Sequence, residues 1–178
     1  DHEGLVPQLR TWLSERGHEV RIVNGGVSGD TTAGGLARID WALTPEIDAM
    51  IVALGGNDLL RGLDPAVSRA NLDGILQKAE AANVEVLLVG MSAPGNYGPD
   101  YKAAFDAMYP DLAARHDALY MSDFFEGLRA DAEDPAALRE FMQPDGIHPN
   151  GDGVSRIVEA LGPEVEKLID RVEAASGL

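Results

Sequence analysis

Two kinds of hydrophobic pattern alternate along this chain of 178 residues. Short, nearly continuous runs of apolar and β-branched residues predict strands at 20–23, 50–54, 84–89 and, more weakly, 118–121. Between and after them, apolar positions recur with helical spacing at 32–43, 65–82, 99–115 and 154–175. Nearly continuous apolar strands that alternate with helices are typical of a parallel sheet covered on both faces. The pattern therefore predicts an α/β domain of the doubly wound type.

The first element does not fit this alternation. Residues 4–15 place Leu5, Leu9, Trp12 and Leu13 on one face of a helix, and this helix precedes every predicted strand. In a βα series a helix normally follows a strand, although an α/β domain can also begin with a helix. From the pattern alone, a helix-first domain and a domain whose first strand is missing from the sequence both remain open.

Composition excludes several classes of protein. The length fits one domain, which we expect to span residues 1–178, and 45% hydrophobic residues are enough for an ordinary core. No apolar run approaches the roughly 18 residues that a membrane span needs. The absence of cysteine excludes disulfides, thiolate zinc sites and a cysteine nucleophile. With 14 basic against 30 acidic residues, the formal charge is −16, the reverse of the basic surface that binds nucleic acids.

In open parallel sheets, ligands bind beyond the carboxyl ends of the strands, so a site is expected in the segments that follow strands. Residues 24–32, Asn-Gly-Gly-Val-Ser-Gly-Asp-Thr-Thr, follow the first predicted strand. They fit a turn in which Asp30 or Thr31 caps the next helix, and they also allow Gly29 to turn a backbone N–H toward a developing anion. Ser28 is a weak candidate nucleophile, because Asp30 stands where the G-x-S-x-G elbow requires its second glycine.

Residues 55–58, Gly-Gly-Asn-Asp, follow the second predicted strand. They fit a glycine turn with a cap, and they also offer Asn57 as a side-chain amide donor of the kind found in oxyanion holes. Residues 91–99 follow the third strand and are rich in turn residues, which suits the rim of a pocket. The sequence contains no phosphate-binding Gly-x4-Gly-Lys motif, and we expect no cofactor.

Asp145 and His148 lie three residues apart, in a loop bounded by prolines that directly precedes the last predicted helix. A loop of this length can hold the carboxylate against one imidazole nitrogen and leave the other nitrogen as a general base. One alternative is a turn in which Asn150 caps the helix and His148 is incidental. The other is a metal site, but no other histidine is spaced to share a metal with His148, so we expect no metal.

Three blocks in this order resemble the SGNH (GDSL-type) hydrolases, and in particular the bacterial arylesterase and acyl-CoA thioesterase/lysophospholipase group. The blocks are residues 24–31, 54–58 and 142–150, and the resemblance spans essentially the whole chain. It implies a flavodoxin-like three-layer α/β/α fold with a Ser–His–Asp triad. It also implies that Gly29 is the backbone oxyanion donor and Asn57 the side-chain donor, while His148 is the base and Asp145 orients it.

One block of that family is absent from this sequence. The resemblance implies a Gly-Asp-Ser-Leu motif with the nucleophile right after the first strand, and this sequence begins inside or just before the helix that follows. The missing block and the missing strand are therefore the same segment. In the strand order 2-1-3-4-5 the first strand is internal. We therefore expect the molecule to contain a segment upstream of Asp1 that carries the serine, either in the chain or cleaved and still bound.

The resemblance implies acyl transfer from a small ester to water through an acyl-enzyme. The charge of −16 favours neutral short-chain or aryl esters as substrates, and thioesters and lysophospholipids are less favoured candidates. Leu59, Leu60, Pro94 and Tyr97 are candidates for an acyl pocket. Two rivals remain open: a non-catalytic flavodoxin-like binding module, and a pseudo-enzyme that lacks the nucleophile. The composition fits a soluble protein, either cytoplasmic, periplasmic or secreted.

Overall fold

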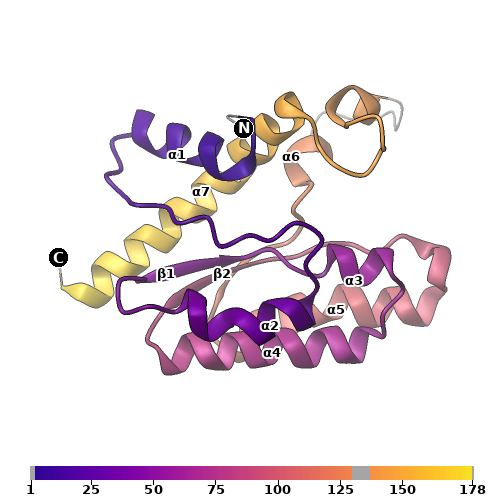
Figure 1. The fold of residues 1–178 in the computed structure, drawn as a ribbon, viewed down its shortest axis with the longest axis horizontal. Helices are drawn as coiled ribbons and strands as arrows, with labels where there is room; N and C mark the ends of the chain where they lie inside the picture. Colours follow the sequence, from indigo (N-terminus) through magenta and orange to yellow (C-terminus); the bar gives the residue numbers. More distant parts are fainter. Residues whose placement is uncertain (1–2, 130–136, 178) are drawn as a thin grey trace. The chain divides into compact units, whose positions relative to one another are not determined.

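A parallel sheet in the order β1-β2-β3 organises the middle of the chain in the computed structural model, which describes residues 3–129 and 137–177 (Figure 1). The strands are β1 (Ala49–Val52), β2 (Glu85–Val89) and β3 (Leu119–Met121). β1 and β2 run parallel, with Met50 opposite Val86. These are three of the four predicted strands, and their order in the sheet follows their order in the sequence. The predicted α/β class is confirmed.

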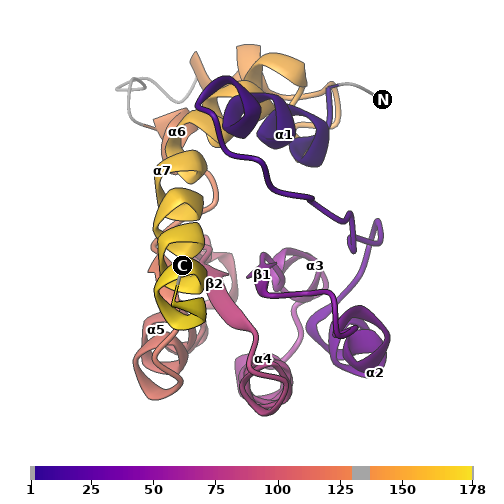
Figure 2. The same cartoon turned by 90° about the vertical axis from the view of Figure 1, so that its left-hand side faces the viewer.

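Helices connect the strands on one side of this sheet. Figure 2 shows α2, α4 and α5 together on that side. Leu72 and Ile75 of α4 and Phe105 and Met108 of α5 are fully buried in one apolar cluster with Leu88 of β2. Each such side chain contributes about 1.5–3 kcal/mol by leaving water, so this cluster holds the helices on the sheet. The bounds are α2 (Thr32–Ala42), α3 (Gly56–Leu60), α4 (Pro65–Ala81), the 3₁₀ turn η1 (Gly95–Tyr97) and α5 (Pro99–Arg115).

The other face of β2 is buried as well. Leu87 and Val89 alternate with Leu88 along β2 and do not belong to the apolar cluster formed with α4 and α5, yet both are fully buried. Residues 166–177, which include the end of helix α7 (Gly151–Ser176), form one compact unit with residues 25–123. In this unit, Arg171 of α7 binds the Asp117 carbonyl oxygen just before β3. Helices therefore lie on both sides of the sheet, as the predicted three-layer fold requires. We call residues 25–123 and 166–177 the sheet unit.

The remaining described residues, 3–24, 124–129 and 137–165, form a second compact unit that we call the helical unit. It contains α1 (Leu5–Glu15), α6 (Glu126–Arg129), the 3₁₀ turn η2 (Ala137–Phe141) and the first part of α7. Gly162 of α7 leaves no room for a β-carbon, because the Trp12 ring of α1 packs directly on it. The side-chain amide of Gln8 donates to the Gly151 carbonyl oxygen over 2.9 Å. These contacts join α1 to the start of α7.

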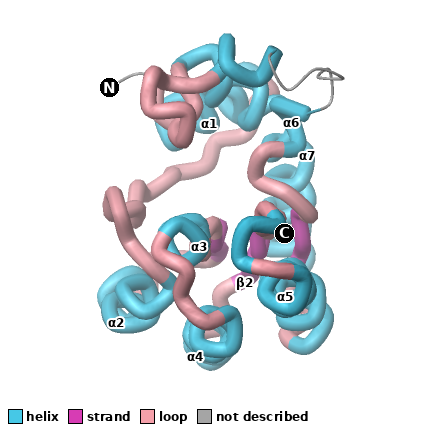
Figure 3. Tube along the Cα trace, turned by 90° about the vertical axis from the view of Figure 1, so that its right-hand side faces the viewer, coloured by secondary structure: helices cyan, strands magenta, loops and turns pink. Residues whose placement is uncertain are grey.

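The prediction of a strand at residues 20–23 is wrong. In the structure this segment is an extended loop, drawn as such in Figure 3, and Val20 and Val23 are 42% and 55% exposed. Arg10 binds the carbonyl oxygen of Ile22 over 2.5 Å. An apolar run becomes a strand only when a neighbouring strand pairs with its backbone groups, and no described strand pairs with this one.

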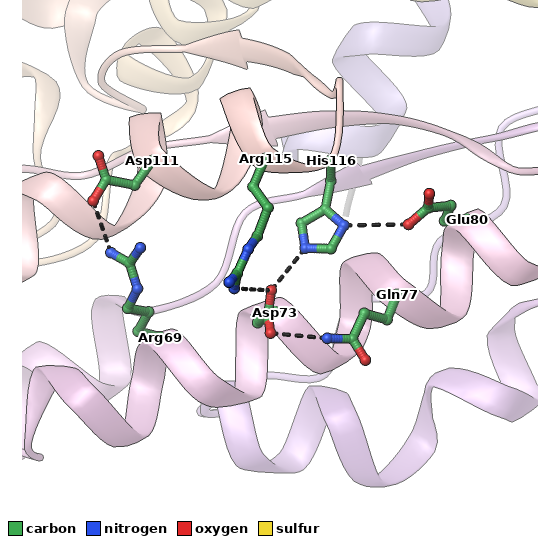
Figure 4. A network of polar contacts seen from close by, with 7 residues as sticks. All are labelled: Arg69, Asp73, Gln77, Glu80, Asp111, Arg115 and His116. Atoms are coloured by element: carbon green, nitrogen blue, oxygen red, sulfur yellow. Dashed lines mark hydrogen bonds and ion pairs between the residues drawn. The ribbon is translucent and has the colours of Figure 1, made fainter.

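A polar network on the surface of the sheet unit ties α4 to the end of α5 (Figure 4). Asp73 of α4 accepts hydrogen bonds from Nε2 of His116 at 2.7 Å, from Arg115 at 3.2 Å and from Gln77 at 2.9 Å. The other ring nitrogen of His116 lies 3.3 Å from Glu80. The hydrogen bond from His116 and the nearby guanidinium of Arg115 hold the pKa of Asp73 below its usual 3.8.

We expect Asp73→Asn to lower the melting temperature at pH 7 by roughly 2–8 °C, since a charge-assisted hydrogen bond contributes about 1–2 kcal/mol. Because the pKa of Asp73 is lower in the folded chain, its contribution is complete above the usual carboxyl pKa and is lost as the pH falls through the folded value. Thermal unfolding from pH 7 to pH 3 should therefore show the gap between wild type and variant closing below about pH 4.

The matched control is Asp111→Asn, which removes the exposed Arg69–Asp111 ion pair between the same two helices. A surface pair of this kind contributes about 0–1 kcal/mol, so its melting temperature should stay close to that of the wild type. An Asp73→Asn gap that is the same at pH 7 and pH 3 would contradict the role given to the carboxylate.

Candidate active site

A glycine turn at the carboxyl end of β1 positions Asn57. Gly55 has φ +116°, in the region that favours glycine, and a β-carbon there would clash with the hydroxyl of Tyr109. That hydroxyl donates to the carbonyl oxygen of Leu54 over 2.9 Å. Burial raises the pKa of Tyr109, which keeps the hydroxyl a neutral donor. The turn is therefore held from α5, and α3 begins directly after it with Asn57 in its first turn.

Hydrogen bonds connect the segments that carry the two predicted oxyanion residues, Gly29 and Asn57. Nδ2 of Asn57 donates to the carbonyl oxygen of Asp30 over 2.9 Å, which leaves the second amide proton available for a ligand. Gly29 precedes Asp30 and adopts φ +76°. Its N–H makes no hydrogen bond to any residue that the structure describes, while its carbonyl oxygen accepts from Arg61 at 3.0 Å.

A small pocket of about 170 Å³ lies at the carboxyl end of β1. Its polar wall is the ion pair between Asp30 and Arg38, whose atoms are 2.7 Å apart. Asn57 is the predicted site residue that lines this pocket. The lining residues are Gly26, Val27, Asp30, Arg38, Ala53, Leu54, Gly55, Gly56, Asn57 and Met91.

The four residues expected to form an acyl pocket do not line this cavity. Leu59 packs against the apolar core below the sheet. Leu60 and Tyr97 are 55% and 43% exposed, and the Tyr97 hydroxyl lies 3.5 Å from the Leu60 carbonyl oxygen. Pro94 is exposed and directly precedes η1. The structure thus brings Leu60 and Tyr97 together, and a role for the four residues in acyl binding stays a prediction.

In the helical unit, Asp145 and His148 form a hydrogen-bonded pair. Oδ2 of Asp145 lies 2.7 Å from Nδ1 of His148, and Oδ1 accepts the backbone N–H groups of Ile147 and His148 at 2.9 and 3.0 Å. Because an ionised carboxylate can only accept, the proton of the neutral ring lies on Nδ1. Nε2 therefore carries the lone pair, and it makes no hydrogen bond to a described residue. The His148 side chain is 65% exposed.

The same contacts keep Asp145 charged. The hydrogen bond from His148 and the two backbone N–H groups lower the pKa of Asp145 to about 2. The carboxylate consequently stays ionised at any pH at which an ester hydrolase is normally assayed. It can both orient the imidazole and stabilise the imidazolium that forms when Nε2 accepts a proton.

The loop that holds this pair is fixed at both ends. Gly146 has φ +66°, and its N–H donates to the carbonyl oxygen of Gln143 over 2.9 Å. Oδ1 of Asn150 accepts from the N–H of Gly153 at 2.9 Å and so caps α7. The cap considered as an alternative reading of this segment is therefore present alongside the Asp145–His148 pair.

Residues that the sequence did not single out hold the oxyanion segment in place. Residues 55–58 were expected as a glycine turn with a cap, yet Asp58 is 1% exposed and binds Thr32 and Ser68. The burial of Asp58 could not be predicted from the Gly-Gly-Asn-Asp sequence, because its partners Thr32 and Ser68 lie 26 and 10 residues away. Ser28, the weak candidate nucleophile, lies in an exposed turn and makes no hydrogen bond to a described residue.

The model of the GDSL-like lipase/acylhydrolase family matches residues 2–156. The chain belongs to the GDSL-like lipase/acylhydrolase family. The resemblance drawn from the three sequence blocks is thereby confirmed. Membership of a family of carboxylic ester hydrolases identifies the chain as an enzyme of this class, in preference to a flavodoxin-like binding module.

Named members of the family resemble the chain over most of its length. It is 40% identical to esterase TesA of Pseudomonas aeruginosa over 168 residues, which cover 94% of this chain and 80% of that protein. It is 38% identical to thioesterase 1/protease 1/lysophospholipase L1 of Escherichia coli strain K12, covering 84% of this chain and 69% of that one. The fold is similar to that of the psychrotrophic esterase EstA from Pseudoalteromonas sp., solved with monoethylphosphonate as inhibitor. The TM-score is 0.84 at 27% identity, over 95% of this chain and 89% of EstA.

None of the helices in residues 3–129 and 137–177 combines the length and apolarity needed to cross a bilayer. No three acidic or histidine side chains in those ranges are arranged to hold a metal ion.

Proposed function

We propose that the chain is a serine esterase that hydrolyses neutral short-chain or aryl carboxylic esters, with thioesters and lysophospholipids as secondary substrates. The observation that carries this proposal is the Asp145–His148 pair. A carboxylate 2.7 Å from Nδ1 fixes the imidazole and leaves Nε2 as a general base. Gly29 and Asn57, with an unused N–H each, support it as donors to an oxyanion.

In the proposed reaction, the serine hydroxyl attacks the ester carbonyl while Nε2 of His148 takes its proton. The oxyanion of the tetrahedral intermediate accepts from the N–H of Gly29, the amide of Asn57 and the serine's own N–H. His148 then protonates the leaving alcohol, so that the carbon–oxygen bond breaks and an acyl-enzyme remains. The same base removes a proton from water, which hydrolyses the acyl-enzyme and restores the serine.

We propose that the serine lies in a segment upstream of Asp1. β1 pairs with β2 on one side, and no described strand pairs with its other edge. A parallel strand added there would end beside Asn57, because the carboxyl ends of parallel strands meet at one edge of a sheet. A serine directly after that strand would face the pocket at the end of β1.

Charge selects among the esters. A protein with a net charge of −16 repels polyanions such as long acyl-CoA, and salt screens this repulsion. We therefore expect kcat/KM for an acyl-CoA to rise as NaCl is increased from about 0.01 to 0.5 M, while kcat/KM for an uncharged aryl acetate stays nearly constant over that range.

The test is hydrolysis of a chromogenic aryl acetate by the full chain that carries the nucleophile. The protein should be colourless and should release the chromophore catalytically. Failure to cleave any carboxylic ester or thioester would contradict the proposed function. A falling rate with acyl-CoA as salt is added would contradict the substrate preference alone.

A further inference from the structure

A buried carboxylate lies next to the proposed oxyanion donors and has no part in the reaction described above. Asp58 follows Asn57 in α3 and is 1% exposed. Its Oδ2 accepts the backbone N–H of Thr32 at 2.9 Å. Its Oδ1 accepts the hydroxyls of Thr32 at 2.5 Å and Ser68 at 2.8 Å. Burying a charged group is unfavourable unless its hydrogen bonds are satisfied, and here three donors from α2 and α4 satisfy it.

The direction of each hydrogen bond in this cluster is fixed. Nδ2 of Asn71 donates to the Thr32 hydroxyl at 3.0 Å, so that hydroxyl accepts from Asn71 and gives its own proton to Asp58. Asp58 also places negative charge at the first turn of α2, where the helix dipole favours it. A fully satisfied buried network allows one arrangement and resists others. The cluster therefore fixes the start of α2 relative to α3.

The start of α2 is continuous with the segment that carries the oxyanion donor. Three contacts join residues 29–32 to α3 and its end: Arg61 to the Gly29 carbonyl, Asn57 to the Asp30 carbonyl, and Thr32 to Asp58. Of the three α3-side residues, Asp58 alone is fully buried, and Arg61 is exposed. Asp58 is thus the buried residue that holds residues 29–32, which include Gly29, against α3, which carries Asn57.

We propose that Asp58 is a positioning residue that sets the spacing between the Gly29 N–H and the Asn57 amide, a role that rests on the proposed function. Asp58 is buried and does not line the pocket at the end of β1, so it acts through the two donors. An oxyanion hole is effective because its donors are already placed where the charge develops. Loss of the Asp58 carboxylate should therefore slow the chemical step and leave the binding of the ester largely unchanged.

The variant that tests this is Asp58→Asn in the full chain. An amide has the shape of the carboxylate but can accept at only one of its two ends. Either the Thr32 N–H or the hydroxyls of Thr32 and Ser68 therefore lose their acceptor. A displacement of the donors by about 1 Å can cost on the order of 10²-fold. We expect kcat for an aryl acetate to fall roughly 10- to 100-fold, with KM within about twofold of the wild type.

A double-mutant cycle with Asn57→Ala separates positioning from simple destabilisation. If Asp58 acts through Asn57, then Asp58→Asn will cost much less in the Asn57→Ala background than in the wild type. Asp73→Asn is the matched control, because it makes the same chemical change in a network between helices that does not touch the donors. It should lower the melting temperature with kcat unchanged. If Asp58→Asn does not fold, Ser68→Ala removes one hydrogen bond from the same carboxylate and should show the same coupling at smaller size.

The outcomes distinguish the two proposals. A fall in kcat with constant KM and strong coupling to Asn57→Ala is the expected result. Multiplicative effects of Asp58→Asn and Asn57→Ala on kcat, or a rise in KM at constant kcat, would overturn the positioning role while the esterase function stands. A wild-type chain that cleaves no ester would overturn both.

Discussion

Replacing His148 with alanine is expected to reduce kcat for an aryl acetate by roughly 10⁴-fold or more, because its imidazole is the proposed general base for the serine. In the structure its Nδ1 is held by Asp145 at 2.7 Å, and its Nε2 has no partner among the described residues. The side chain is 65% exposed, so its removal should cost little stability. Steady-state kinetics on the purified variant, with a melting curve, measure both quantities.

His116→Ala is the matched control. His116 also lies 2.7 Å from a carboxylate, that of Asp73, but there it joins α4 to α5. It should therefore lose stability and keep kcat, the reverse of what is expected for His148→Ala. Turnover near the wild-type rate in His148→Ala would show that the general base lies elsewhere.

The second large effect is expected for Asn57→Ala, with a loss of roughly 10²–10³ in kcat. The reason is that the side-chain amide donates to the oxyanion in the transition state more strongly than to the ester carbonyl in the ground state. KM should therefore change little. Stopped or continuous chromogenic assays over a range of substrate concentration give kcat and KM separately.

Asn57→Ala also removes the hydrogen bond from Asn57 to the Asp30 carbonyl oxygen. Asn57→Asp loses the same hydrogen bond and adds a negative charge that repels the oxyanion, so it should lower kcat at least as far as alanine does. Gln77→Ala, which removes an exposed amide donor on α4, should leave kcat unchanged. An Asn57→Ala enzyme with wild-type kcat would refute the oxyanion role.

Most of the fold was predictable because its helices carry a local signal. The apolar spacing placed α2, α4 and α5 to within one residue at either end, since Thr31 and Asp64 cap helices and prolines begin two of them. The strand at 20–23 failed because pairing is a long-range property that an apolar run does not contain. The short helix α3 was expected as a turn, since five residues carry too little periodicity to be recognised.

In the candidate site, too, local contacts were predictable and long-range contacts were not. The Asp145–His148 contact spans three residues, so the spacing alone was enough to anticipate it. The hydrogen bonds that hold Gly29 and Asn57 near each other were only partly predictable, because they join residues 26 to 32 positions apart in the sequence. Which apolar residues line a cavity depends on the packed fold, and the cavity at the end of β1 is lined by residues other than Leu59, Leu60, Pro94 and Tyr97.

The central claim, that hydrolysis proceeds through an acylated serine, is tested most directly by labelling the full chain with a fluorophosphonate and mapping the adduct by mass spectrometry. Such a probe reacts with a serine only when a general base and an oxyanion hole act on it. We predict a single adduct on a serine upstream of Asp1, formed at least 100-fold more slowly in His148→Ala. An adduct on Ser28, or an active enzyme that takes up no label, would contradict the account.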